Sequence, residues 1–97
     1  MFIIHANYLK SLEIVDQYLN AHRTFLEEGY SKNYFIASGP KNPRTGGVIL
    51  SQLTDRDQIE SIFKNDPFYI HGIAEYVIEE FSPVKFHRDF APFIEKK

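Results

Sequence analysis

The chain has 97 residues, of which 43% are hydrophobic and 25% are charged; these proportions are typical of a globular domain and exclude a disordered tail, a collagen-like repeat or a coiled coil. The net charge of −2 indicates no nucleic-acid or membrane partner, and the absence of cysteine excludes disulfides, thiolate catalysis and cysteine-ligated metal sites. We expect a single cytoplasmic domain over residues 1–97, because no signal peptide and no run of roughly 20 apolar residues is present.

The first part of the chain predicts a strand, a long helix and a second strand. The apolar, β-forming residues 2–6 are typical of a strand. Apolar residues at steps of three and four predict a helix over 11–28, with Gly29 as its stop. A second short strand is predicted over 34–37, and the small residues 38–40 should end it in a turn.

The middle of the chain predicts a loop, a strand and a second helix. Two glycines and a proline make 41–47 the clearest loop. The apolar run over 48–53 has the length of a strand. Thr54 then resembles a helix N-cap, and the helix that follows should end at Asn65.

The last part predicts one helical turn and a final strand. Asp66 is a favoured N-cap, and Pro67 suits the first helical position because no backbone donor is needed there. A long strand is expected over 73–81, with an edge resuming over 84–86. The residues from 86 to 97 form an aromatic C-terminal tail.

The order strand, helix, strand, strand, helix, strand, with a short extra helical turn before the last strand, predicts an α+β domain of the ferredoxin-like split β-α-β type. Its helices should cover one face of the sheet. Residues 48–50 are apolar on both sides of their strand, so we expect the second face to be covered too. A homodimer packed through that face is the simplest cover, and the aromatic tail is another candidate.

His22 is the first candidate functional residue. At about 100° per residue, it lies near the middle of an apolar arc that runs from Leu12 round to Phe25, where an apolar residue is expected. A buried imidazole without a hydrogen-bond partner costs about 1–3 kcal/mol. His22 is therefore either a core histidine bonded to a backbone carbonyl or a group kept for its chemistry.

Asp66 is the second candidate, and two roles are compatible at this position. As an N-cap it accepts a backbone hydrogen bond, and the helix amides and dipole stabilise its carboxylate. Such a carboxylate can also orient a histidine and stabilise its protonated form. The split β-α-β layout allows Asp66 to lie near the middle of the first helix, so a His22–Asp66 pair is geometrically permitted.

Three further residues are candidates for contacting a substrate. Ser38 and Gly39 stand in a predicted turn, where free backbone amides can bind a carbonyl or carboxylate oxygen. Arg44, in the predicted loop, is either solvated or placed to meet an anionic group. The histidines form no HxH, HxxxH or HExxH pair, so we expect no metal site.

These pieces together resemble the YciI-like proteins of the YCII-related domain family. The resemblance rests on the helix segment Ala21-His22-Arg23-Thr24-Phe25-Leu26, the turn Ala37-Ser38-Gly39-Pro40, Gly46-Gly47, and Asn65-Asp66-Pro67-Phe68 before the final strand. It implies a ferredoxin-like domain that dimerises as in the dimeric α/β-barrel group. It also implies His22 and Asp66 as the active-site pair, with Ser38 as their neighbour. The aromatic tail departs from the family's pattern.

The resemblance also implies the leading functional interpretation, a cofactor-independent enzyme of lyase or isomerase type that acts on a small cyclic or aromatic compound. His22 would be the general base or acid, and Asp66 would orient it. Alanine at either position is expected to abolish turnover with little change in melting temperature. The alternative is a non-catalytic small-molecule-binding or regulatory module. RNA binding is disfavoured, because the strand over 48–53 lacks stacking aromatic residues.

Overall fold

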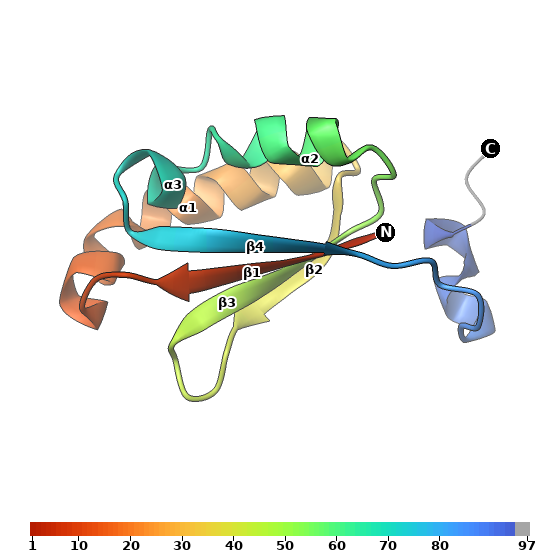
Figure 1. The fold of residues 1–97 in the computed structure, drawn as a ribbon, viewed down its shortest axis with the longest axis horizontal. Coiled ribbons are helices and arrows are strands. Elements are labelled where there is room, and N and C mark those ends of the chain that lie inside the picture. The colour runs from red at the N-terminus through yellow and green to blue at the C-terminus, as the bar shows by residue number, and fades with distance from the viewer. Residues whose placement is uncertain (95–97) are drawn as a thin grey trace.

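The computed structural model describes residues 1–94, which form a four-stranded antiparallel sheet with helices packed on one face (Figure 1). The elements in chain order are β1 (Phe2–Tyr8), α1 (Leu12–Ser31), β2 (Phe35–Pro40), β3 (Gly46–Ser51), α2 (Arg56–Phe63), α3 (Pro67–Ile70), β4 (Ala74–Glu80) and a 3₁₀ helix (Arg88–Phe93). This order confirms the predicted α+β architecture, including the short helix before the last strand.

The sheet has the strand order β2-β3-β1-β4, so β1 and β3 are central and β2 and β4 are edges. Each strand–helix–strand unit therefore has another strand between its two strands, which is the split β-α-β topology. In β1, Phe2, Ile4 and Ala6 are buried, and the residues between them are less buried. This period of two directs one side of the sheet at the helices.

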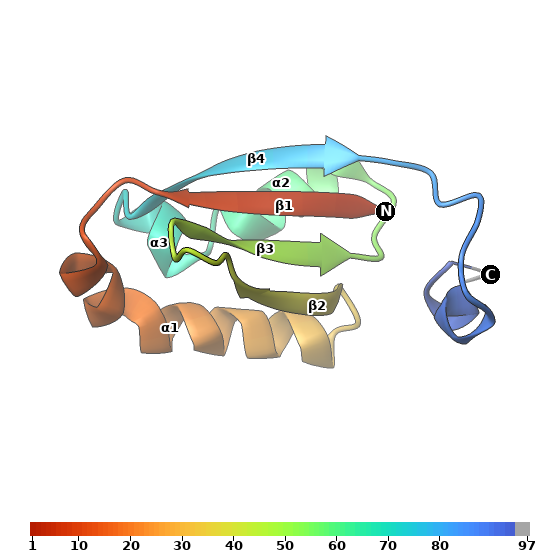
Figure 2. The same ribbon diagram turned by 90° about the horizontal axis from the view of Figure 1, so that it is seen from below.

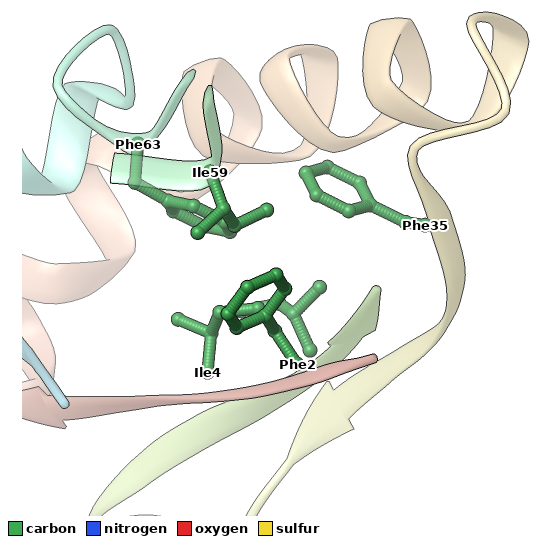
Figure 3. Close-up of a cluster of buried hydrophobic side chains, with 6 residues drawn as sticks. Phe2, Ile4, Phe35, Ile59 and Phe63 are labelled. Carbon is green, nitrogen blue, oxygen red and sulfur yellow. The ribbon is translucent and has the colours of Figure 1, made fainter. Parts of the chain in front are cut away.

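The buried apolar side chains divide into two clusters along the sheet. The apolar cluster, most of which is drawn in Figure 3, contains Phe2, Ile4, Phe35, Ile49, Ile59 and Phe63. The second cluster contains Ala6, Val15, Phe68, Ile73 and Ala74. Both lie between the sheet and the helices, so the two halves of the fold share one continuous layer.

Gly29 does not end α1, contrary to the sequence expectation, because the helix continues to Ser31. Gly29 is buried against β2, and a Cβ atom there would lie 2.0 Å from Cε2 of Phe35. The chain instead turns at Asn33, which has a φ of 62°. The glycine thus permits close packing of α1 on the Phe35 ring.

Several predicted element boundaries were wrong in the middle of the chain. β3 runs over Gly46–Ser51 and not over 48–53, so the last two residues of the predicted loop over 41–47 belong to a strand. The N-cap of α2 is Asp55 and not Thr54, because the Asp55 side chain accepts a hydrogen bond from the amide of Asp57 at 3.0 Å. The residues predicted as a turn, 38–40, belong to β2, since pairing with β3 extends the ladder to Pro40. Local turn propensity is here overruled by strand pairing.

The turn between α3 and β4 follows the sequence closely. Asp66 is the N-cap and Pro67 the first residue of α3, as predicted. Gly72 has a φ of 65°, the left-handed conformation that glycine adopts without steric cost. The Ile73 amide then donates to the Phe68 carbonyl at 2.8 Å, which leads the chain into β4.

Among the described residues, no helix or strand covers the face of the sheet opposite the helices (Figure 2). The aromatic tail does not cover it, because the 3₁₀ helix lies beyond the end of the strands (Figures 1 and 2). No strand forms over 84–86, so the predicted edge is wrong, and the last tail residues, 95–97, lie outside the described residues. Within the described part of the chain, no helix has the length and apolar composition needed to span a bilayer.

Candidate active site

His22 lies on the buried side of α1, as its place in the apolar arc predicted. The buried residues of this helix are Val15, His22 and Gly29, which follow one another at steps of seven residues and form one line facing the sheet. His22 is 8% exposed. Val15, at one end of this line, is aliphatic, and Gly29, at the other end, has no side chain. Within the described residues, the imidazole of His22 is therefore the only polar side chain among the buried positions of α1.

Asp66 is the partner of His22. Nδ1 of the imidazole lies 2.9 Å from Oδ1 and 3.0 Å from Oδ2 of the carboxylate, across 44 residues of sequence. A carboxylate can only accept, so Nδ1 carries the proton in this pair. The alternative of a histidine bonded to a backbone carbonyl is thereby excluded at Nδ1.

The carboxylate of Asp66 is fully buried and is also the cap of α3. Its Oδ1 accepts a hydrogen bond from the backbone amide of Phe68 at 3.0 Å. The structural and the histidine-orienting roles therefore occur together. The cap fixes the position of the carboxylate, because its geometry depends on the first turn of the helix.

Tyr76 completes the surroundings of Asp66, and sequence reasoning missed it. Its hydroxyl donates to Oδ2 of Asp66. Burial and the neighbouring Asp66 carboxylate raise the pKa of Tyr76, so the phenol remains a neutral donor. The available signal was the period of two in β4, which places Tyr76 on the same side as Ala74 and Ile78.

Phe68 holds the imidazole from its flat side. The His22 and Phe68 rings are stacked, with centroids 4.0 Å apart and planes 4° apart. Within residues 1–94, Nε2 of His22 has no hydrogen-bond partner, and no buried side-chain nitrogen or oxygen lacks one. Nε2 is therefore accessible, and the ring is fixed through its other nitrogen and its face.

The accessible edge of His22 borders a cavity of about 570 Å³ between α1 and the sheet. Four of the five candidate residues chosen from sequence line this cavity: His22, Ser38, Gly39 and Arg44. Asp66 does not line it but lies behind the imidazole. Leu19, Leu26, Val48, Ile49 and Phe68 supply much of the apolar wall.

Ser38 and Gly39 reach the cavity from the edge strand β2. The Ser38 hydroxyl lies 2.7 Å from the hydroxyl of Tyr30 on α1. Gly39 pairs with Val48, which pairs with His5 on the open face of the sheet, so Gly39 lines the cavity through its backbone. Both residues therefore present small groups to the cavity, although they do so from a strand and not from the expected turn.

Arg44 is paired with another side chain. Its guanidinium Nη2 lies 2.5 Å from Oδ1 of Asp16 on α1 and its Cζ lies 5.9 Å from the centre of the Tyr8 ring. The hydrogen bond lowers the pKa of Asp16 and raises that of Arg44. Asp16 and Tyr8 also line the cavity, and neither was singled out from the sequence.

The other histidines lie apart from this site. His5 pairs with Glu79 at 3.0 Å, and the His71 ring lies 4.6 Å from that of Tyr18. Within residues 1–94, no group of three or more His, Asp or Glu side chains is arranged to hold a metal ion. The cavity lining includes one imidazole that is tethered to a buried carboxylate, together with several polar groups.

Comparison with known proteins agrees with this fold. The family model of the YCII-related domain matches residues 1–82. No curated protein matches the sequence. The chain is similar to a solved structure of 5-chloro-2-hydroxyhydroquinone dehydrochlorinase from Burkholderia phenoliruptrix AC1100 in complex with 2,5-dihydroxybenzoquinone, with a TM-score of 0.71, 22% sequence identity, and coverage of 82% of this chain and 91% of that one. The likeness shows a shared ferredoxin-like fold. Because the family model spans most of its length, this chain belongs to the YCII-related domain family.

Proposed function

We propose that the protein is a cofactor-independent acid–base enzyme, of lyase or isomerase type, that acts on a small cyclic or aromatic compound. The observation that carries the proposal is the state of His22, which is tethered to Asp66 at Nδ1 and is accessible at Nε2 beside a cavity. A general base needs an oriented lone pair within reach of the substrate proton. Imidazole provides such a lone pair near neutral pH.

In the proposed step, Nε2 of His22 accepts a proton from a C–H or O–H group of the substrate. The electron pair left behind forms a new double bond. In an elimination, a leaving group such as chloride departs with its bonding pair from a tetrahedral carbon conjugated with the new double bond. In a chlorinated hydroquinone, a proton first moves from one hydroxyl group to the chlorine-bearing carbon, and loss of a second hydroxyl proton then expels chloride and leaves a quinone. In an isomerisation, the imidazolium returns the proton to a different atom. Asp66 balances the charge on the ring in both cases.

The cavity supports a ligand of one or two rings. Its volume of about 570 Å³ lies within the range of small-molecule sites, and its wall combines apolar side chains with a few polar groups. Ser38, Gly39 and Arg44 are proposed to contact the substrate. The similar structure is that of a dehydrochlorinase of a chlorinated hydroquinone, and loss of hydrogen chloride from such a ring is an elimination.

The test is chloride release from 5-chloro-2-hydroxyhydroquinone by the wild type and by His22→Gln. Glutamine removes the base, so the rate should fall by about 10²-fold or more. His87→Gln is the matched control, because His87 is exposed and does not line the cavity, being the N-cap residue before the 3₁₀ helix. An unchanged rate in His22→Gln would contradict the proposal. Recovery of the bound compound unchanged from the wild type would favour the non-catalytic binding or regulatory module.

We also propose that two copies pack through the open faces of their sheets. On that face, Ile3 lies opposite Leu50 of the neighbouring strand, and His5 lies opposite Val77. The side chain of Val77 is 46% exposed. Sedimentation equilibrium should give a dimer mass for the wild type and a monomer mass for Val77→Glu, because a carboxylate in an apolar contact is costly. A monomeric wild type at micromolar concentration would contradict this.

A further inference from the structure

The rim of the cavity is positively charged on balance. Two arginines, Arg23 and Arg44, line it together with a single acidic residue, Asp16. Charges near a partly enclosed space favour a ligand of the opposite sign. The sum at this rim therefore favours an anionic group on the ligand.

Asp16 engages Arg44 only in part. One contact of 2.5 Å joins Nη2 to Oδ1, and a guanidinium has five N–H donors. The side chains of Arg44 and Asp16 are 32% and 52% exposed, so water and salt weaken the pair. The pair can therefore be opened, or shared, by a ligand anion that reaches Arg44 from the cavity.

The position of the pair links it to His22. Asp16 lies on the same helix as His22, and Arg44 lies on the connection between β2 and β3, so the pair bridges two walls of the cavity. A ring that lies along the apolar wall can place an anionic substituent at Arg44 and a reactive atom towards Nε2 of His22.

We propose that the cavity selects small aromatic compounds that carry a carboxylate or phenolate group, and that Asp16 sets their affinity by competing with that group for Arg44. The inference rests on the proposed function in taking the cavity as the substrate site. Because the Arg44 hydrogen bond lowers the pKa of Asp16, the competitor is charged at neutral pH. Asp16 is thus a specificity-determining residue and takes no part in proton transfer.

The experiment is an NMR titration of the full chain with benzoate and with benzamide, which has the same ring and no charge. Arg44→Gln should weaken benzoate binding by about tenfold, and Asp16→Asn should strengthen it by about threefold to fivefold, as expected for one partly screened ion pair. Both variants should change benzamide binding by less than about twofold. The exposed changes Glu27→Gln and Arg88→Gln are the matched controls for net charge.

The double variant sharpens the test. If Asp16 acts only through Arg44, the variant with both changes should bind benzoate as Arg44→Gln alone does. Benzoate should also shift the amide signals of Gly39 and Gly47, which line the cavity. Weaker benzoate binding in Asp16→Asn, equal binding of benzamide and benzoate by the wild type, or no benzoate binding at millimolar concentration would each overturn the proposal.

The two proposals fail in distinguishable ways. Benzoate binding with the expected responses to Asp16→Asn and Arg44→Gln, but without any His22-dependent turnover, would leave the anion site standing and refute the enzyme. Turnover that depends on His22 but is limited to neutral compounds would refute the anion site alone.

Discussion

The two ends of the buried layer differ in how they are held together. The apolar cluster consists of hydrocarbon side chains in mutual contact, with Phe35 and Phe63 rings 5.5 Å apart. At the other end, which we term the polar end, His22, Asp66 and Tyr76 form hydrogen bonds inside the protein. The stability of apolar contacts depends on the buried area and on how well the side chains fit together. The stability of buried hydrogen bonds depends on their direction and on the protonation state of each partner.

This difference teaches where substitutions should separate stability from chemistry. Tyr76 contacts both ends, because its ring lies 5.1 Å from that of Phe63 while its hydroxyl reaches Asp66. A change in the apolar cluster should lower stability alone. A change at the polar end should alter stability and the state of the imidazole together.

The largest effect on stability is expected for Phe35→Ala in the apolar cluster. Phe35 is 3% exposed, and its removal leaves a cavity among aromatic rings, so the free energy of unfolding should fall by about 3–5 kcal/mol. Urea denaturation followed by circular dichroism measures this loss. Phe86→Ala, at an exposed phenylalanine, is the control and should change stability by less than about 0.5 kcal/mol. A similar loss in both variants would remove the contrast.

Asp66→Ala is expected to lower the free energy of unfolding by about 2–4 kcal/mol. About 1 kcal/mol comes from the lost helix cap and the rest from leaving the hydrogen-bonding groups of His22 and Tyr76 without their partner. This replaces the sequence-based expectation of a nearly unchanged melting temperature, because Asp66 is fully buried. Asp66→Asn, which preserves the shape of the side chain, should lose less.

Thermal denaturation of both Asp66 variants checks this ordering. An Asp66→Ala protein as stable as the wild type would mean that the carboxylate contributes nothing to the polar end. A chloride-release assay on Asp66→Asn then separates the two roles, since this variant should stay folded while the imidazole loses its carboxylate partner.

Tyr76→Phe should have the smallest effect of the three, about 1–3 kcal/mol at neutral pH, from the lost hydrogen bond to a buried carboxylate. In the wild type, the pKa of the Tyr76 hydroxyl is raised by folding, so the folded state holds the phenol proton more strongly than the unfolded state does. The stabilisation is fully present below the ordinary tyrosine pKa of about 10 and is lost as the pH rises above it.

Urea denaturation of the wild type and Tyr76→Phe between neutral pH and pH values above 10 measures this dependence. The difference in unfolding free energy between the two proteins should shrink at alkaline pH. A difference that stays constant across this range would show that the phenol is not a protonated donor to Asp66.

Much of the fold could be predicted because its signals are local. Asp66 and Pro67 lie next to each other and mark the start of α3 by cap geometry alone. Where a local signal competed with packing, the prediction was wrong. Gly29 resembled a helix stop but serves the close approach of Phe35, and the residues 38–40 resembled a turn but pair in the sheet.

Three features could be predicted from the sequence alone: the order of the elements, a histidine on the apolar face of a helix and an aspartate at the start of another. Each of these depends on neighbours within a few residues. Only the tertiary structure decided that His22 meets Asp66, that Tyr76 shares the same carboxylate, and that Asp16 pairs with Arg44. These contacts join separate elements, and their distances follow from how the helices pack on the sheet. Side-chain chemistry was visible in the sequence, whereas its assembly around one cavity required the folded chain.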